Sequence, residues 1–471
     1  MSTSPARDSP NKSKSVNPLD DFYLDILGQQ GTPVYTQICL CYGLPDTSSD
    51  WYPQIIETLQ AGLKRLAASF PWAAGQIVNE GAGPGNSGIY KIKPLENAPV
   101  LVVKDLRVDS DAPTMESLRQ SSFPFRMLDE SVICPQPTLI LPGTSPQEVC
   151  LVQLTLITGG LLFAFLGHHA AMDGIGQGQL MHLLNKACRN EPFTPEELAT
   201  GNAPRRDIIP LLDDSYTPGA ELNHQLFAPP ATPPPLPNQP LQPPPQKLWA
   251  NFIFSGAALT ELKATTAASL ASGYISTDDA ITALVWQCVT RARLHLDPDA
   301  SVTLARAVSV REFLNIPPTY PGVVNNMTYH HSTASLLTDP TSMPLGAIAT
   351  NLRAELDPKT SSLSYMTRAM ATYLHRAADK TTINITARLD LAKDIMLSSW
   401  AKLPCYEFDF GMGIGVPEAI RRPQFTPVES LMYLMPRKAD GEIVLTLCLR
   451  EDDMVRLSTD PEFIKYCRYA V

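Results

Sequence analysis

A proline-rich segment near the middle of the chain constrains the fold most strongly. Pro229 to Gln246 contains two runs of three prolines, at 233–235 and 243–245. Proline fixes φ and lacks a backbone donor, so this segment cannot lie inside a helix or a sheet. It is either an extended spacer between two lobes or a disordered insertion, and composition alone favours neither. The 471 residues, 44% of them hydrophobic, suffice for two lobes that each bury a core.

Charge argues against a nucleic-acid partner. The chain has 37 Lys and Arg against 47 Asp and Glu, which gives a net charge of -10. Proteins that bind nucleic acid gain much of their affinity by neutralising phosphates, which an acidic surface does not do.

The chain is predicted to be cytoplasmic, with no membrane partner. Its most apolar stretch, Leu151 to Leu166, is interrupted by Gln153, two threonines and Gly159-Gly160. That pattern predicts two strands around a glycine turn rather than a transmembrane span. The polar N-terminus has no apolar signal core. Nine scattered cysteines without a Cys-x-x-Cys pair indicate free thiols, and no spacing suggests a metal site.

Apolar periodicity predicts mixed helices and strands. Residues 1–20 are polar and are expected to be disordered. Each half mixes both element types without strict alternation, which indicates an α/β or α+β sandwich. We expect helices over Trp51–Ser69, Gln177–Cys188 and Thr277–Leu294, and strands over Val34–Tyr42, Ala98–Leu106, Thr138–Leu141, Leu248–Phe254 and Thr303–Val310.

The stretch from His168 to Gly174, His-His-Ala-Ala-Met-Asp-Gly, is the first candidate site. Adjacent strand residues point to opposite faces, so only one histidine easily faces a given cavity. A histidine there suits a general base, since its pKa lies near neutrality. Asp173 either orients that ring or pairs with an arginine and holds the loop, and we favour the second role. Gly174 would allow close packing where the chain turns into a helix. The competing interpretation is a core histidine pair followed by a helix-capping aspartate.

The second motif is Asp409-Phe410-Gly411-Met412-Gly413. With the first, it resembles the BAHD acyltransferase superfamily, which carries His-x-x-x-Asp-Gly centrally and Asp-Phe-Gly-Trp-Gly near the C-terminus. The stretch from Ser398 to Pro404 and the N-terminal Tyr35-Thr36-Gln37 look closest to the fungal branch typified by trichothecene 3-O-acetyltransferase. Further similar stretches are Phe70-Pro71-Trp72-Ala73-Ala74-Gly75, Ser276-Thr277-Asp278-Asp279-Ala280 and Val310-Arg311 with Pro317-Pro318.

The resemblance implies two lobes like chloramphenicol acetyltransferase, each a mixed sheet with helices. The N-terminal lobe would span 21–225, the proline-rich crossover 226–247 and the C-terminal lobe 248–471. A tunnel would run between the lobes, with a coenzyme A thioester entering one mouth and the acceptor the other. The family also implies a monomer without a tightly bound cofactor.

By the same resemblance, the chain is an O-acyltransferase that uses acetyl-CoA or another acyl-CoA to esterify a hydroxylated secondary metabolite. His169 would be the general base. Ser398 and Trp400 match positions that contact the oxyanion or substrate, with plain packing as the alternative. Asp173 would pair with Arg311. Gly174, Asp409, Gly411 and Gly413 would be structural. Met412 stands where the family has Trp, and this departure leaves the shape of the thioester channel open rather than the chemistry.

Two other functions stay open. A carrier protein could supply the acyl group, as in condensation-type enzymes that release or esterify a polyketide or peptide. The chain could also be a binding protein without catalysis, although the intact His169, Asp173 and Gly174 argue against this.

Overall fold

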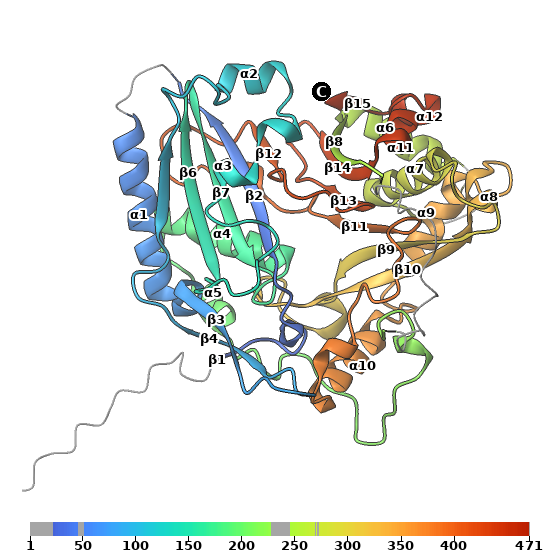
Figure 1. Ribbon diagram of the computed structural model, residues 1–471, viewed down its shortest axis with the longest axis horizontal. Coiled ribbons are helices and arrows are strands. Elements are labelled where there is room, and N and C mark those ends of the chain that lie inside the picture. The colour runs from blue at the N-terminus through green and yellow to red at the C-terminus, as the bar shows by residue number, and fades with distance from the viewer. Residues whose placement is uncertain (1–21, 46–50, 228–244, 269, 271–272, 471) are drawn as a thin grey trace, which may run out of the picture.

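The protein is described by a computed structural model over residues 22–45, 51–227, 245–268, 270 and 273–470. The predicted disordered N-terminus lies outside the described residues, as does most of the proline-rich segment, 228–244. The lobe boundaries at 225 and 247 therefore stay predictions. Two large mixed sheets stand side by side, each with its own helices (Figure 1). The expected α/β fold class is confirmed.

The first sheet has five strands in the order β12-β2-β7-β6-β5. Helices α1 (Trp51–Ser69) and α4 (Gly174–Cys188) pack on one face, and α2 (Met115–Gln120) and α3 (Glu130–Ile133) contribute to the core on the other. Because both faces are covered, β6 and β7 are mostly apolar and are buried along their whole length. The strands are β12 (Ala419–Arg421), β2 (Tyr35–Gly43), β7 (Gly160–His168), β6 (Cys150–Ile157) and β5 (Leu101–Asp105).

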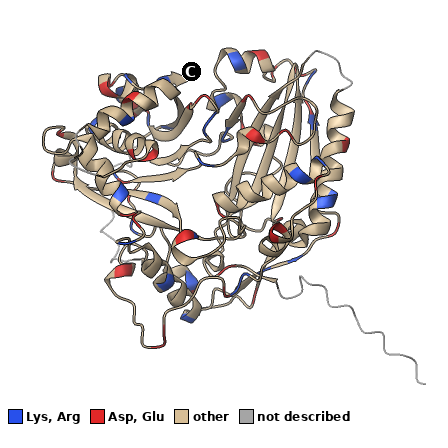
Figure 2. Ribbon diagram, turned by 180° about the vertical axis from the view of Figure 1, so that it is seen from behind, with Lys and Arg blue, Asp and Glu red and all other residues tan. Residues whose placement is uncertain are grey.

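The hairpin β6–β7 delivers the histidines. Ile157 pairs with Gly160, and Gly159 has φ +79°, so a glycine suits this turn. The predicted glycine turn is confirmed. Strands β2, β6 and β7 carry no Lys, Arg, Asp or Glu, and Figure 2 shows most charged residues on peripheral helices and loops.

The second sheet has seven strands in the order β10-β9-β11-β13-β14-β8-β15. Its core packs mainly against α7 (Thr277–Ala292), which is buried on nearly every side. The strands are β10 (Asn325–Thr333), β9 (Ser301–Ser309), β11 (Ile395–Ser399), β13 (Leu431–Leu434), β14 (Ile443–Arg450), β8 (Lys247–Phe254) and β15 (Arg468–Ala470). The other helices of this half are α6 (Gly256–Ala267), α8 (Ala334–Thr338), α9 (Leu345–Ala354), α10 (Leu363–Arg376), α11 (Glu451–Ser458) and α12 (Pro461–Ile464).

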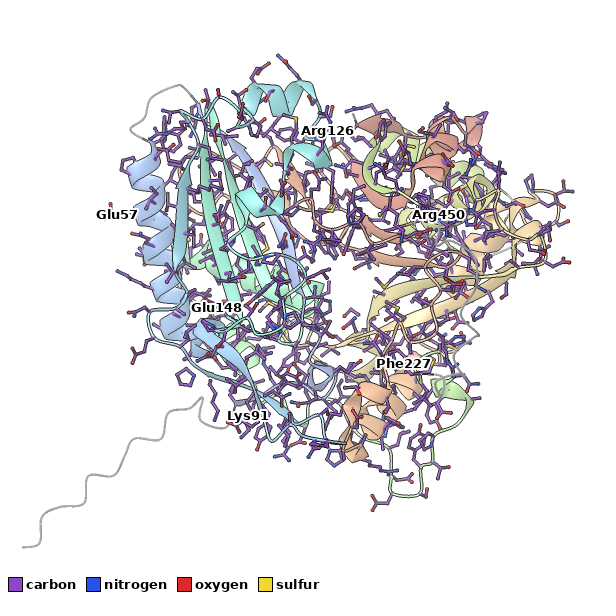
Figure 3. All side chains as sticks on the ribbon, viewed as in Figure 1. Glu57, Lys91, Arg126, Glu148, Phe227 and Arg450 are labelled. Atoms are coloured by element: carbon purple, nitrogen blue, oxygen red, sulfur yellow. The ribbon has the colours of Figure 1, made fainter. Side chains whose placement is uncertain are left out.

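Two segments cross between the halves. Ile209 and Leu222 pack in the core that surrounds α10, and Phe227, the last described residue before the proline-rich segment, lies on that side (Figure 3). In the opposite direction, β12 pairs with β2 and completes the first sheet. Helix α5 (Pro195–Gly201) follows α4 and precedes the first of these crossing segments. A small third sheet joins β1 (Phe22–Tyr23), β4 (Ile89–Pro94) and β3 (Gly75–Glu80).

Two predicted elements differ from the structure. Thr138–Leu141 forms no strand but only one bridge, from Leu139 to Val34, because Pro137 and Pro142 flank it and cannot donate. Helix α4 begins at Gly174, three residues earlier than predicted, because the Asp173 carboxylate caps it by accepting from the Gly176 N–H at 2.8 Å.

All nine cysteines are described and none is in a disulfide; eight are buried and Cys188 is partly exposed. Within the described ranges, no helix combines the length and apolarity that crossing a bilayer requires.

Candidate active site

A cavity of about 380 Å³ lies where the two sheets face each other. Its walls include Thr36 on β2, Met327 on β10 and Ser398 on β11. The predicted residues His169, Asp173, Gly174, Ser398 and Trp400 all line it. The structure therefore brings together residues that lie more than two hundred positions apart in the chain.

His169 is the first residue after β7, and its backbone N–H donates to the Val34 carbonyl at 2.8 Å. Its ring is partly exposed to the cavity. Burial lowers its pKa, while the Asp173 charge and a hydrogen bond to the residue's own backbone carbonyl oppose this, and the Arg422 charge adds to the lowering. In the tautomer that carries its proton on Nδ1, Nε2 keeps its lone pair and can accept a proton.

His168 points away from the cavity. Its Nδ1 accepts from the Ala170 N–H at 3.2 Å, so its Nε2 donates to Gln147 Oε1 at 3.2 Å. Burial lowers the pKa of His168 to about 3, which keeps this ring neutral. Figure 3 marks Glu148 at this end of the first sheet, and its carbonyl accepts from the hydroxyl of Tyr35, whose ring packs edge-on to His168. The core-histidine interpretation is therefore correct for His168.

Asp173 forms the expected ion pair with Arg311, with two nitrogen–oxygen distances of 2.8 and 3.0 Å. Both groups are at most 4% exposed. The backbone N–H groups of Gly176 and Val324 also donate to the carboxylate. Four donors occupy both oxygens, and none of them is His169, so this geometry supports holding the loop rather than orienting the ring.

Arg311 extends this network into the second half. Its Nε donates to the carbonyl of Tyr320 at 3.0 Å, and its Nη2 donates to the carbonyl of Gly322 at 2.8 Å. Asp25 holds the same loop from the other side, because its carboxylate accepts from the Tyr320 hydroxyl and from the Val323 N–H. The two carboxylates thus clamp residues 320–324 next to the start of α4.

The two glycines at the start of α4, Gly174 and Gly176, differ in how closely neighbouring atoms pack against them. A Cβ on Gly176 would lie 2.1 Å from the Pro321 carbonyl oxygen, which excludes any side chain. A Cβ on Gly174 would lie 3.3 Å from Trp400 Nε1, a tight contact. Close packing at Gly174 is as expected, although the stricter requirement falls on Gly176.

Ser398 and Trp400 form a unit on the wall opposite His169's hairpin. The Trp400 indole N–H donates to Ser398 Oγ at 3.2 Å. Ser398 has no other hydrogen-bond partner among the described residues, so its own hydroxyl hydrogen is available to a ligand. The indole donor is already used, and its ring packs against Tyr433 at 4.9 Å between centroids.

The second motif lies away from the cavity. Asp409 pairs with Arg189 at 2.6 Å and accepts from the Gly411 N–H, and these contacts lower its pKa although partial burial opposes this. Gly411 and Gly413 have φ +64° and +77°. Met412 is 1% exposed in the core of the first sheet and does not line the cavity. The side chain of Met412 therefore fills space in the core beside the first sheet.

Several polar groups that line the cavity were not predicted from the sequence. Isolated threonines and asparagines carry no sequence signal, and only the folded strands bring them to one place. They are Thr36, Thr138, Ser309, Asn325, Asn384, Thr386 and Arg422. No group of three or more potential metal ligands occurs within the described part of the chain.

Comparison with known proteins identifies the family. A profile described as "Transferase family" matches residues 137–464, and one described as "Trichothecene 3-O-acetyltransferase-like N-terminal domain" matches 34–188. The chain belongs to the BAHD acyltransferase superfamily. The predicted resemblance is thereby confirmed, and membership makes the chain an acyltransferase.

Among BAHD relatives, an O-acetyltransferase from Cryptosporiopsis sp. (strain 8999) is 50% identical over 95% of this chain and 97% of its own length. The trichothecene 3-O-acetyltransferase of Fusarium sporotrichioides is 47% identical over 95% and 97%. Its crystal structure with coenzyme A and T-2 superposes with a TM-score of 0.87 over 96% of this chain and 99% of that one, at 45% identity. Vinorine synthase, 17% identical with a TM-score of 0.62 over 97% and 96%, shares the fold.

Proposed function

We propose that this chain transfers an acetyl group from acetyl-CoA to a hydroxyl of a secondary metabolite within the cavity between the sheets. One observation carries the proposal: His169 lines this cavity and its lowered pKa favours the neutral ring that can accept a proton, while Ser398 lies on another wall. The relatives support the substrates, because solved trichothecene 3-O-acetyltransferases hold coenzyme A together with T-2 or deoxynivalenol.

The reaction is a direct transfer. Nε2 of His169 removes the proton of the acceptor hydroxyl as its oxygen attacks the thioester carbonyl carbon. The tetrahedral oxyanion then collapses, the carbon–sulfur bond breaks, and the coenzyme A thiolate takes up the proton from the imidazolium. The cavity holds both reactants together, which supplies much of the rate enhancement.

Ser398 is proposed to stabilise the oxyanion. Its Oγ accepts from Trp400, which orients the hydroxyl hydrogen toward the cavity. Asp173 and Arg311 act as positioning residues that fix the loop after β7. Gly174, Asp409, Gly411 and Gly413 have backbone or ion-pair roles outside the chemistry.

The activity is expected to survive mild acid. The base works only as the neutral ring, and burial holds the pKa of His169 below its ordinary value of 6.5. As the pH falls, the decline of kcat/KM should therefore be centred below pH 6.5. A pH profile with buffer controls for stability measures this. An acid limb centred above 6.5 would contradict the assigned environment.

Ser398→Ala should lower kcat by about 10²-fold, since it removes one preorganised donor to the oxyanion. The KM for acetyl-CoA should change little. Trp400→Phe is the matched control, because it removes the indole donor and keeps a ring against Tyr433. It should cost less than Ser398→Ala. Equal kcat values for Ser398→Ala and the unmodified enzyme would show that Ser398 only packs in the cavity wall.

The proposal is tested by incubating the purified protein with acetyl-CoA and a panel of hydroxylated secondary metabolites that includes deoxynivalenol. Ester formation by mass spectrometry should match thiol release. Thioester hydrolysis without ester, or transfer only from an acylated carrier protein, would contradict it.

A further inference from the structure

Arg422 is a buried cation at the cavity wall that the proposed chemistry does not use. It follows directly after β12, is 1% exposed, and lines the cavity together with His169. Among the residues that the structure describes, no carboxylate forms an ion pair with it. By contrast, Arg311 forms an ion pair with Asp173, which lines the same cavity.

The hydrogen bonds of Arg422 leave one of its three guanidinium nitrogens without an acceptor. Nη1 donates to the carbonyl of Gln37 and Nη2 to Thr138 Oγ1, both at 3.0 Å. Nε is buried and has no acceptor. Negative charge reaches the guanidinium only through Thr138, whose Oγ1 in turn donates to the carboxylate of Glu130 at 2.6 Å. Burying a charged donor without an acceptor is costly, so an arriving oxygen that accepts from it gains affinity.

The guanidinium is also held in place. Its carbon lies 4.5 Å from the ring centroid of Phe425 and 5.6 Å from that of Tyr433. Both rings line the cavity, and the neighbouring wall residues Val34, Leu139 and Val428 are apolar. A ligand on this side therefore meets apolar side chains, the hydroxyl groups of Thr36 and Thr138, and a guanidinium that is held in place.

We propose that Arg422 determines acceptor specificity by donating a hydrogen bond to a second oxygen of the acceptor, a carbonyl or cyclic ether oxygen on an otherwise apolar skeleton. This inference rests on the proposed function, since it names the acceptor class of that same cavity. The oxygen is distinct from the hydroxyl that is acylated.

The neighbouring Arg421 provides a matched control. It is equally buried, but its Nε, Nη1 and Nη2 all donate to backbone carbonyls, of Phe123, Ile420 and Ser122. It does not line the cavity. Replacing Arg421 by Lys should therefore affect stability without changing the choice of acceptor.

The test compares two acceptor alcohols that differ only in the second oxygen, such as a hydroxy ketone and its deoxo analogue. The unmodified enzyme should prefer the oxygenated acceptor by roughly 10- to 100-fold in kcat/KM, as expected for a hydrogen bond to a charged group. Arg422→Gln should remove this preference by lowering kcat/KM for the oxygenated acceptor alone. The KM for acetyl-CoA should stay the same, and Arg421→Lys should keep the preference.

A second readout separates this role from structural support. Asp173 and Arg422 are the charged side chains that act on His169, in opposite directions. Losing the Arg422 charge should move the acid limb of the pH profile to higher pH, whereas Arg421→Lys should leave it in place.

Three results would overturn the inference: equal use of both acceptors by the unmodified enzyme, an equal loss for both in Arg422→Gln, or a raised KM for acetyl-CoA instead. The comparison of acceptors on the unmodified enzyme needs no variant, so equal use of both acceptors overturns the inference even if Arg422→Gln does not fold. Absence of any transfer by the unmodified enzyme would instead refute the proposed function.

Discussion

His169→Ala is expected to lower kcat by about 10³-fold or more, because it removes the group that is proposed to accept the hydroxyl proton. The free energy of unfolding should change by about 1 kcal/mol or less, since the ring is partly exposed and its main structural contact is a backbone hydrogen bond to Val34. Steady-state kinetics and denaturant unfolding measure the two effects.

His168→Ala is the matched control, one residue earlier on the same hairpin. It deletes a buried ring that bonds Gln147 and Ala170. Loss of these partners should destabilise the protein by about 1–3 kcal/mol while kcat of the folded enzyme stays within a few-fold. If the two variants exchanged these phenotypes, the assignment of the base would be wrong.

Asp173→Ala is expected to be the most destabilising change near the site, by about 3–5 kcal/mol. It leaves Arg311 buried without its counter-charge and removes the cap of α4. The rate should also fall, because the loop after β7 loses its anchor. Chemical denaturation with parallel activity measurements tests this prediction.

Asp409→Ala gives the comparison with a solvent-exposed pair. Asp409 and Arg189 are 32% and 41% exposed, and exposed ion pairs contribute about 1 kcal/mol or less to the free energy of unfolding.

For Asp173→Ala, a fall in kcat at unchanged free energy of unfolding would contradict the prediction and would indicate that Asp173 acts directly on His169.

Local patterns predicted the elements that bury a regular face. Helix α1 matches its predicted range, because Ile55, Leu59 and Leu63 recur at helical spacing over one face of the first sheet. The β6–β7 hairpin follows from two apolar runs around Gly159. The strand predicted over Thr138–Leu141 was wrong, because the prolines on both sides of this apolar run prevent regular strand pairing.

The site was predictable only in part. His169, Asp173 and Arg311 belong to motifs, and the pair Asp173–Arg311 follows from the family resemblance. Arg422 carried no signal, because the choice between Arg421 and Arg422 depends on how β12 pairs with β2. A long-range strand pairing of this kind sets which side chain meets the cavity, and no local pattern encodes it.

The most direct test of the account is a crystal structure of the protein with coenzyme A and an acceptor alcohol that it acetylates. The acceptor hydroxyl is expected within hydrogen-bonding reach of His169 Nε2, about 2.6–3.2 Å, with the coenzyme A sulfur approaching the same point. An acceptor bound elsewhere, with no ligand atom near this ring, would contradict it.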